Sequence, residues 1–208
     1  MTARRPSDDT LASFAAGHLD EGFALVVAAH LEQDEVSRRR LKDLEAVQGA
    51  LLREVEPAPM TTPVSAVLAR LDEAAAPAAA AVPDGETEMP RVLAPYALGK
   101  WRPLGIGIKM RRVAVPGAEA RVFMLKAAPG VTLPDHQHSG REWTTILSGA
   151  YEHEYGRFGA GDFDEADDEH EHSPRVDPVL GCTCIVALTG DVVFKGWLGR
   201  LLQPLVRL

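Results

Sequence analysis

Between residues 130 and 142 the sequence reads Gly130-Val-Thr-Leu-Pro-Asp-His136-Gln-His138-Ser-Gly-Arg-Glu142. On a β-strand, the two-residue spacing of His136 and His138 places both imidazoles on one face. Glu142 follows a Ser-Gly turn that can bring its carboxylate back toward the two rings. Two imidazoles and a carboxylate that converge are typical ligands of a first-row divalent metal ion. The stretch therefore predicts a metal site built on β-strands.

Five of the seven histidines lie between residues 136 and 172, so we expect a fourth ligand from the histidines that follow Glu142. His153 alternates with charged residues and is expected to face solvent or the mouth of a barrel. Residues 162–171 include seven carboxylates and are expected to form a solvated loop. The field of such a loop would strengthen cation capture and raise the pKa values of nearby histidines.

In the second half of the chain, glycines and prolines recur every 8–12 residues, with short apolar or alternating runs between them. Turn residues at this spacing predict an all-β sandwich or barrel. Cys182 and Cys184 fall on one face of such a strand. They are expected either as small buried hydrophobic residues or as a redox pair beside the metal.

The first 73 residues show helical periodicity instead. Ser7 and Asp20 can cap two helices, the second ending near residue 33, and further helices are expected over 36–55 and 64–71. So few short helices have a small core, which we expect to need a metal, a partner or dimerisation.

Residues 74–90 are rich in alanine and contain three prolines with no hydrophobic period, which is typical of a linker. The predicted organisation is therefore a helical domain over 1–73, an Ala/Pro linker over 74–90 and an all-β domain over 91–208. The predicted fold class is α+β, with two domains.

The composition narrows the function. Two cysteines in 208 residues are too few for a disulfide scaffold and fit the reducing cytoplasm. No apolar run approaches the ~20 residues of a membrane-spanning helix, so no membrane association is expected. A net charge of −8 argues against direct binding of nucleic acid. Residues 1–85 carry 8 basic and 14 acidic side chains, which form either a solvated face or a surface for a basic protein partner.

The histidine-rich stretch resembles the first cupin motif, carried here by Gly130, His136, His138, Glu142 and Gly149. Gly161 and His172 match the second cupin motif in spacing alone. The resemblance implies a double-stranded β-barrel with one divalent metal, held by His136, His138, Glu142 and His172. His170 is the rival fourth ligand.

The helical half contains Phe14-Ala-Ala-Gly17 and Phe23-Ala-Leu-Val-Val-Ala-Ala-His30-Leu ahead of an Arg-rich helix. In these stretches, in the cupin ligands and in Cys182-Thr-Cys184, the chain resembles ChrR-type anti-sigma factors. The resemblance implies a regulator of transcription, not an enzyme, that inhibits an extracytoplasmic-function sigma factor in the cytoplasm. Its cupin metal, zinc with iron or manganese as alternatives, would sense singlet oxygen or a related oxidative stress and trigger release.

One departure from this family concerns a second zinc site. The family's anti-sigma domain binds zinc through an N-terminal histidine and a His-x3-Cys-x2-Cys motif, which here reads His30, Asp34 and Ser37. We therefore expect no N-terminal zinc. His30 and Asp34 are expected on an ordinary exposed helix face, with a weak metal site as the alternative. Sigma-factor binding is expected to persist because the amphipathic pattern is intact, and its loss is the alternative.

Two other functions stay open. A small iron or manganese cupin dioxygenase would use the same four ligands and leave positions for oxygen and substrate. A cupin that binds a small molecule without turnover would show ligand-dependent thermal shifts. The barrel half supplies no clear general base beyond the ligands, which favours the regulator.

Overall fold

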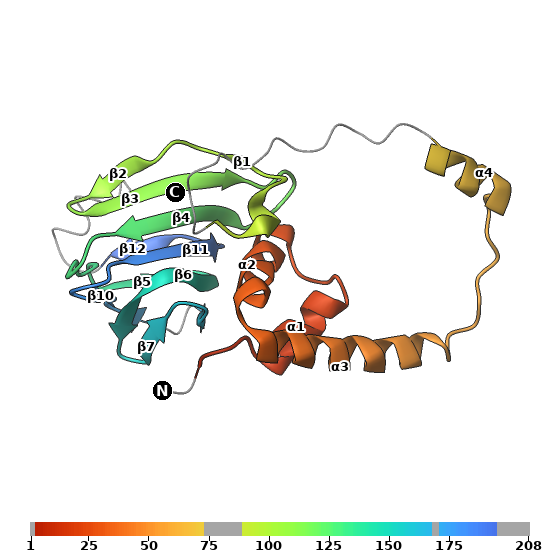
Figure 1. Cartoon of the computed structure of the whole chain (residues 1–208), viewed down its shortest axis with the longest axis horizontal. Coiled ribbons are helices and arrows are strands. Elements are labelled where there is room, and N and C mark those ends of the chain that lie inside the picture. The colour runs from red at the N-terminus through yellow and green to blue at the C-terminus, as the bar shows by residue number, and fades with distance from the viewer. Residues whose placement is uncertain (1–2, 73–88, 168–170, 195–208) are drawn as a thin grey trace.

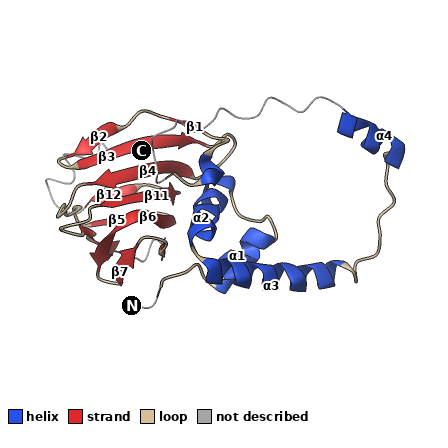
Figure 2. Cartoon of the chain, viewed as in Figure 1, coloured by secondary structure: helices blue, strands red, loops and turns tan. Residues whose placement is uncertain are grey.

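The computed structural model describes residues 3–72, 89–167 and 171–194. Helices precede strands along the chain, and the first helices lie against one side of the sheet (Figures 1 and 2). The α+β fold class is therefore confirmed. The predicted linker lies almost wholly outside the described residues, so the domain boundaries stay a prediction. In the described part of the chain, no helix has the length and apolar character needed to cross a membrane.

The helical elements are α1 (Asp8–Ala15), α2 (Glu21–Gln33), α3 (Glu35–Leu52), α4 (Val64–Ala69) and the 3-10 turns η1 (Arg70–Asp72) and η2 (Arg91–Leu93). The side chains of Ser7, Asp20 and Asp34 accept hydrogen bonds from backbone N–H groups in the first turns of α1, α2 and α3. Such caps satisfy N–H groups that have no partner within the helix. All four predicted helices are confirmed.

The strands are β1 (Ala97–Leu98), β2 (Arg102–Gly105), β3 (Ile108–Ala114), β4 (Arg121–Ala127), β5 (His136–His138), β6 (Glu142–His153), β7 (Gly156–Gly159), β8 (Phe163–Ala166), β9 (Glu171–His172), β10 (Arg175–Val176), β11 (Cys182–Leu188) and β12 (Val192–Phe194). The larger sheet has the order β1-β3-β4-β11-β6-β10, with β2 on β3 and with β7 and β8 on β6. The smaller sheet has the order β12-β5-β9. The two sheets enclose an interior into which every second side chain points.

Two glycines of the cupin motifs are required by the backbone. Gly149 and Gly161 have φ values of +73° and +85°, a region that L side chains rarely adopt. A Cβ atom on Gly149 would also lie 2.0 Å from the carbonyl oxygen of Gly181. The motif spacing therefore reflects turns that strongly favour glycine at these positions.

In the larger sheet, β11 and the first half of β6 are buried on both faces. One face packs against α2, where the rings of Phe23 and Trp143 lie 4.7 Å apart between centroids. The hydroxyl of Thr145 donates to the carbonyl oxygen of Val26 at 2.8 Å. The other face lines the barrel interior, with Ile146 and Val186 among its buried residues. Helices and sheet therefore share one hydrophobic core, and the barrel holds a second.

This shared core corrects the expected source of support for the helices. A metal, a separate partner or dimerisation was the expected support, but the sheet of the same chain covers α2. On α3, an apolar stripe runs through Leu41, Leu44, Val47 and Leu51. Leu41 and Leu44 pack against this core, whereas Val47 and Leu51 are exposed.

We expect the replacement of Phe23 with alanine to destabilise the helices and the barrel together. Phe23 is fully buried between α2 and the sheet, and such truncations cost about 3–5 kcal/mol of unfolding free energy. Urea denaturation, followed by tryptophan fluorescence and by far-UV circular dichroism, should show one coincident transition at lower urea. Leu51→Ala is the control, because its exposed side chain should change the midpoint little. Separate transitions for helices and barrel would contradict the shared core.

Candidate metal centre

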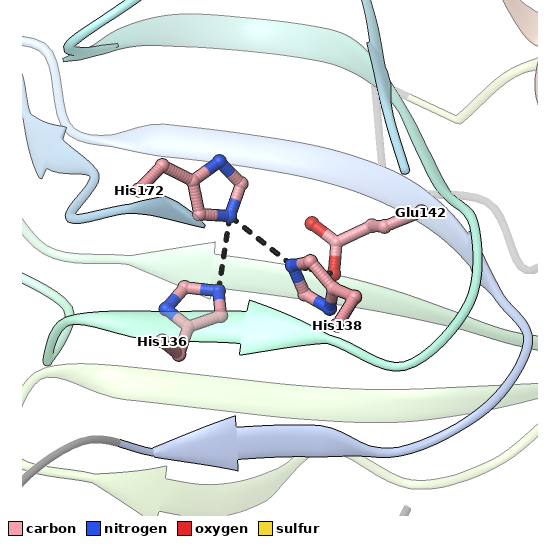
Figure 3. Close-up of side chains that lie close together, drawn as sticks. All are labelled: His136, His138, Glu142 and His172. Carbon is pink, nitrogen blue, oxygen red and sulfur yellow. Dashed lines mark hydrogen bonds and ion pairs between the residues drawn. The ribbon is translucent and has the colours of Figure 1, made fainter. Parts of the chain in front are cut away.

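Three strands bring the predicted ligands together. His136 and His138 lie on β5, Glu142 opens β6, and His172 ends β9. Because β5 and β9 pair with His136 opposite His172, the two rings meet inside the barrel. Figure 3 shows the three imidazoles and the carboxylate turned toward one another. His170, the rival ligand, lies outside the described residues.

The distances between the donor atoms suit a cation. The Nε2 atom of His172 lies 3.0 Å from Nε2 of His136 and 3.2 Å from Nε2 of His138. The Nε2 atom of His138 lies 3.4 Å from Oε2 of Glu142. The Nδ1 atom of His136 contacts the carbonyl oxygen of Pro134 at 2.8 Å. Since a carbonyl only accepts, this contact places the proton on Nδ1 and leaves the Nε2 lone pair facing the other ligands.

Three nitrogens and one carboxylate, all within 4.8 Å of one another, form a donor set that fits a divalent cation. In neutral imidazoles, at least two of the three facing nitrogens carry the same group, either a lone pair or an N–H, and a cation that binds all three lone pairs removes that mismatch. The site belongs to the barrel interior, where the His138 and His172 side chains are buried. The residues present therefore fit a metal, and His3Glu ligation is chemically compatible with zinc, iron or manganese.

Burial sets the protonation of these groups. It lowers the pKa of His138 to about 4 and, together with the nearby imidazoles, that of His172 to about 3. Asp164 of the acidic run raises the pKa of both histidines, in the direction expected of its field, but burial outweighs this effect and the net shift is downward. Burial also raises the pKa of Glu142 to about 7. Near neutral pH the imidazoles are therefore neutral and ready to ligate.

These values predict how metal affinity depends on pH. Below pH 7 a metal must displace a proton from Glu142, so Zn²⁺ affinity should fall about tenfold per pH unit between pH 7 and pH 5. His138 and His172 add little, because their pKa values already lie near or below 4. Competition with a chelator of known proton affinity measures the slope. Glu142→Gln should bind more weakly and lose most of the slope, and an unchanged slope would contradict this assignment.

A second polar group adjoins the ligands. Oδ2 of Asp164 accepts a hydrogen bond from the Tyr151 hydroxyl at 2.6 Å and lies 2.9 Å from Nε2 of His153. The His153 ring lies 5.0 Å from the His172 ring between centroids, and its side chain is 1% exposed. His153 thus faces the barrel, as one alternative held, and not solvent. His153, Asp164 and His172 are also close enough to form a cation-binding group of their own.

The sequence did not single out Asp164, because it lies in the acidic run that was expected to be a solvated loop. That expectation is wrong for residues 163–166, which form β8 with Asp164 buried. The sequence feature that could have indicated a strand here is Phe163-Asp-Glu-Ala166, in which apolar residues flank the acidic pair. Residues 168–170 lie outside the described residues.

Behind the ligands lies a mostly apolar cavity of about 100 Å³ inside the barrel. Cys182 and Cys184 both line it, so they share a strand face as predicted. Both thiols are buried. The hydrogen bond that the protonated Cys184 thiol makes with Cys182, together with burial, raises the pKa of Cys184 well above its ordinary value. The pair thus packs as small apolar residues, and its redox role stays a prediction.

The position of the family's second zinc site holds a hydrogen-bonded network. His30 is completely buried, so its expected place on an exposed helix face is wrong. Its Nε2 atom lies 2.8 Å from the Ser37 hydroxyl. The Asp34 carboxylate accepts from the Ser37 N–H and lies 2.9 Å from Nε of Arg5. A guanidinium therefore supplies the positive charge in this network.

Asp34→Ala is expected to destabilise the protein by about 1–2 kcal/mol, because it removes both the cap of α3 and the partner of Arg5. Chemical denaturation measures this loss. Glu35→Ala is the control, since Glu35 forms its ion pairs with exposed arginines of its own helix. Equal effects from both variants would contradict the role of Asp34.

Comparison with known proteins agrees with this architecture. Residues 90–190 match the family described as the ChrR cupin-like domain. The chain is 38% identical over 218 residues to the Anti-sigma-E factor ChrR of Cereibacter sphaeroides, with 100% of both chains covered. A solved structure, Rhodobacter sphaeroides SigE in complex with the anti-sigma ChrR, matches with a TM-score of 0.72 and 36% identity. That match covers 90% of this chain and 100% of the other. With its similarity extending over the whole of both chains, this protein belongs to the ChrR family of anti-sigma factors.

Proposed function

We propose that the chain is an anti-sigma factor that binds an extracytoplasmic-function sigma factor and holds it inactive. The observation that carries this proposal is the full-length similarity to an anti-sigma factor, with the structural match to a ChrR chain in complex with SigE. These relatives regulate by binding, so the function is not enzymatic. The dioxygenase and small-molecule alternatives have no comparable support.

The surface that suits this partner is an apolar array on α3, α4 and the segment between them. We call it the α3–α4 surface, and it consists of Val47, Leu51, Leu52, Val55, Met60, Val64, Val67, Leu68 and Leu71. These side chains are 44–78% exposed. Figure 1 shows the second half of α3 and all of α4 projecting away from the barrel. Exposed apolar side chains in such number are typical of a protein interface.

Charge supports the same partner. The excess of six acidic side chains in residues 1–85 favours encounter with basic surfaces. The surfaces through which a sigma factor contacts DNA are basic because they meet phosphates. Covering them would block transcription without any contact between this chain and nucleic acid. Since sigma factors act with RNA polymerase, we place the complex in the cytoplasm.

We further propose that the barrel holds one Zn²⁺ through His136, His138, Glu142 and His172. The converging nitrogens and neutral imidazoles support this ligand set. A bound metal would join three separate strands, which makes the barrel conformation depend on its ligation. In this proposal, attack on the centre by singlet oxygen or a related oxidant alters the ligation and leads to release of the sigma factor.

Co-expression tests the proposal. The full chain with an affinity tag is produced with each extracytoplasmic-function sigma factor of the same genome, and the complexes are isolated by gel filtration. A 1:1 complex with one sigma factor, and about one zinc per complex, is the expected result. Absence of any such complex overturns the anti-sigma function, whereas a complex without metal overturns only the zinc centre.

A further inference from the structure

Strand β8 and the start of β6 lie between the candidate metal centre and the helices. Adjacent side chains of a strand point to opposite faces. On β6, Glu142 points into the barrel, whereas Trp143 packs against Phe23 of α2. On β8, Asp164 pairs with Thr144 of β6 and is held inside the barrel by Tyr151 and His153. The wall between the metal centre and the helices is therefore a single sheet layer.

The outer face of β8 contacts the helical half through both neighbours of Asp164. The Phe163 ring packs against the His30 ring of α2, with 5.5 Å between centroids. Glu165 accepts a hydrogen bond from the Ser7 N–H at 3.0 Å and another from the Thr10 hydroxyl of α1. Because consecutive Cα atoms are about 3.8 Å apart, a shift of the β8 backbone at Asp164 also moves both outer contacts.

The segment before α1, residues 4–7, lies along the free edge of β8, and we call it the N-terminal strap. The carbonyl oxygen of Arg4 accepts from the Phe163 N–H at 3.0 Å, and the Arg4 N–H donates to Asp162 at 2.9 Å. Arg5 continues from the strap to Asp34, which caps α3. The contacts of β8 thus reach α1 and α2 directly, and α3 through the strap.

We propose that β8, with the adjoining start of β6, is the element that transmits a change at the metal centre to the anti-sigma helices. Metal ligation holds Glu142 and, through the His172–His153–Asp164 contacts, the inner face of β8. The outer face then holds the strap, α1 and α2. Loss of ligation loosens β8 and releases these contacts. This inference rests on the proposed regulatory function, because it names the route by which the barrel acts on the helices.

Hydrogen–deuterium exchange of the full chain without a sigma factor tests this route. Zn²⁺ is added in one arm and removed by a chelator in the other. In the wild-type chain, Zn²⁺ should slow amide exchange about tenfold in peptides covering residues 3–15 and 21–33. In Glu165→Ala the effect on residues 3–15 should fall below about twofold. The Co²⁺ absorption spectrum of this variant should match the wild type, since Glu165 is outside the ligand set.

Two further variants make the test specific. Thr10→Val removes the hydroxyl that donates to Glu165 from α1 and keeps a similar side-chain volume. It should also reduce the effect of Zn²⁺ on exchange, and it replaces Glu165→Ala in the test if that variant does not fold. Glu119→Ala is the matched control, because the Glu119 side chain is exposed and its hydrogen bond to Asp20 of the helical half is made by the backbone N–H. It should keep the full effect.

A wild-type chain without any Zn²⁺ effect on the helices overturns the route, as does an undiminished effect in the folded Glu165 and Thr10 variants. Because no sigma factor is present, failure of sigma binding would leave these results standing. Conversely, normal sigma binding with no Zn²⁺ effect would overturn the route alone.

Discussion

Leu51→Asp is expected to weaken sigma-factor binding about 100-fold, which corresponds to about 2.7 kcal/mol of binding free energy. Leu51 lies in the last turn of α3, belongs to the α3–α4 surface and is 64% exposed in the free chain. A partner that covers this surface would bury the introduced carboxylate in an apolar contact, where a charge without a partner is costly. The free chain should keep its stability, because exposed positions tolerate polar residues.

Isothermal titration of the full chain with the sigma factor found by co-expression measures this loss. Ala46→Asp is the matched control, since it adds the same charge at an exposed position of α3. It lies five residues from Leu51, which is about 140° around the helix axis. The control should bind within about threefold of the wild type. If both variants bind alike, α3 does not present its apolar stripe to the sigma factor.

His172→Ala is expected to lower the Zn²⁺ affinity by about 100-fold or more, and the protein should be isolated without stoichiometric metal. His172 occupies the centre of the ligand group, with its Nε2 atom within 3.2 Å of both other ligating nitrogens. Its loss leaves two imidazoles and one carboxylate and also opens space at the centre. Metal analysis and competition with a chromophoric chelator measure the change.

The control for this variant is His18→Ala, which removes an exposed histidine from the turn after α1. It should retain one metal per chain at wild-type affinity. The thermal midpoint adds an independent readout, because Zn²⁺ should raise it in the wild type and in His18→Ala but not in His172→Ala. A stoichiometric metal in His172→Ala would remove this residue from the proposed ligand set.

Much of the local structure could be predicted because it depends on neighbouring residues. Ser7 and Asp20 cap helices where the sequence places them, since capping needs only a side-chain oxygen and the N–H groups of the next turn. The His136–His138 spacing likewise predicts two imidazoles on one strand face. The convergence of His172 with them was implied by the cupin resemblance, and the pairing of β5 with β9 produces it.

Environments set by distant segments could not be predicted in this way. From the sequence, His30 is expected on the exposed polar face of an amphipathic helix, yet the contact of α2 with Phe163 buries it. Asp164 reads as part of an acidic loop, yet the pairing of β8 with β6 directs it inward. In both cases the deciding contacts come from segments more than 15 residues away in the chain, which helix and strand periodicity cannot register.

The sequence by itself determined the helix caps, the alternation from helices to strands and the residues able to bind a metal, because these depend on local spacing and side-chain chemistry. Only the tertiary structure decided that α2 shares a core with the sheet and that the α3–α4 surface stays exposed. It also placed β8 between the ligand group and the helices. The physical reason is that the burial of a side chain depends on which other surface contacts it. Apolar periodicity predicts that one face of a helix or strand is buried, but it does not predict which segment or partner protein covers that face.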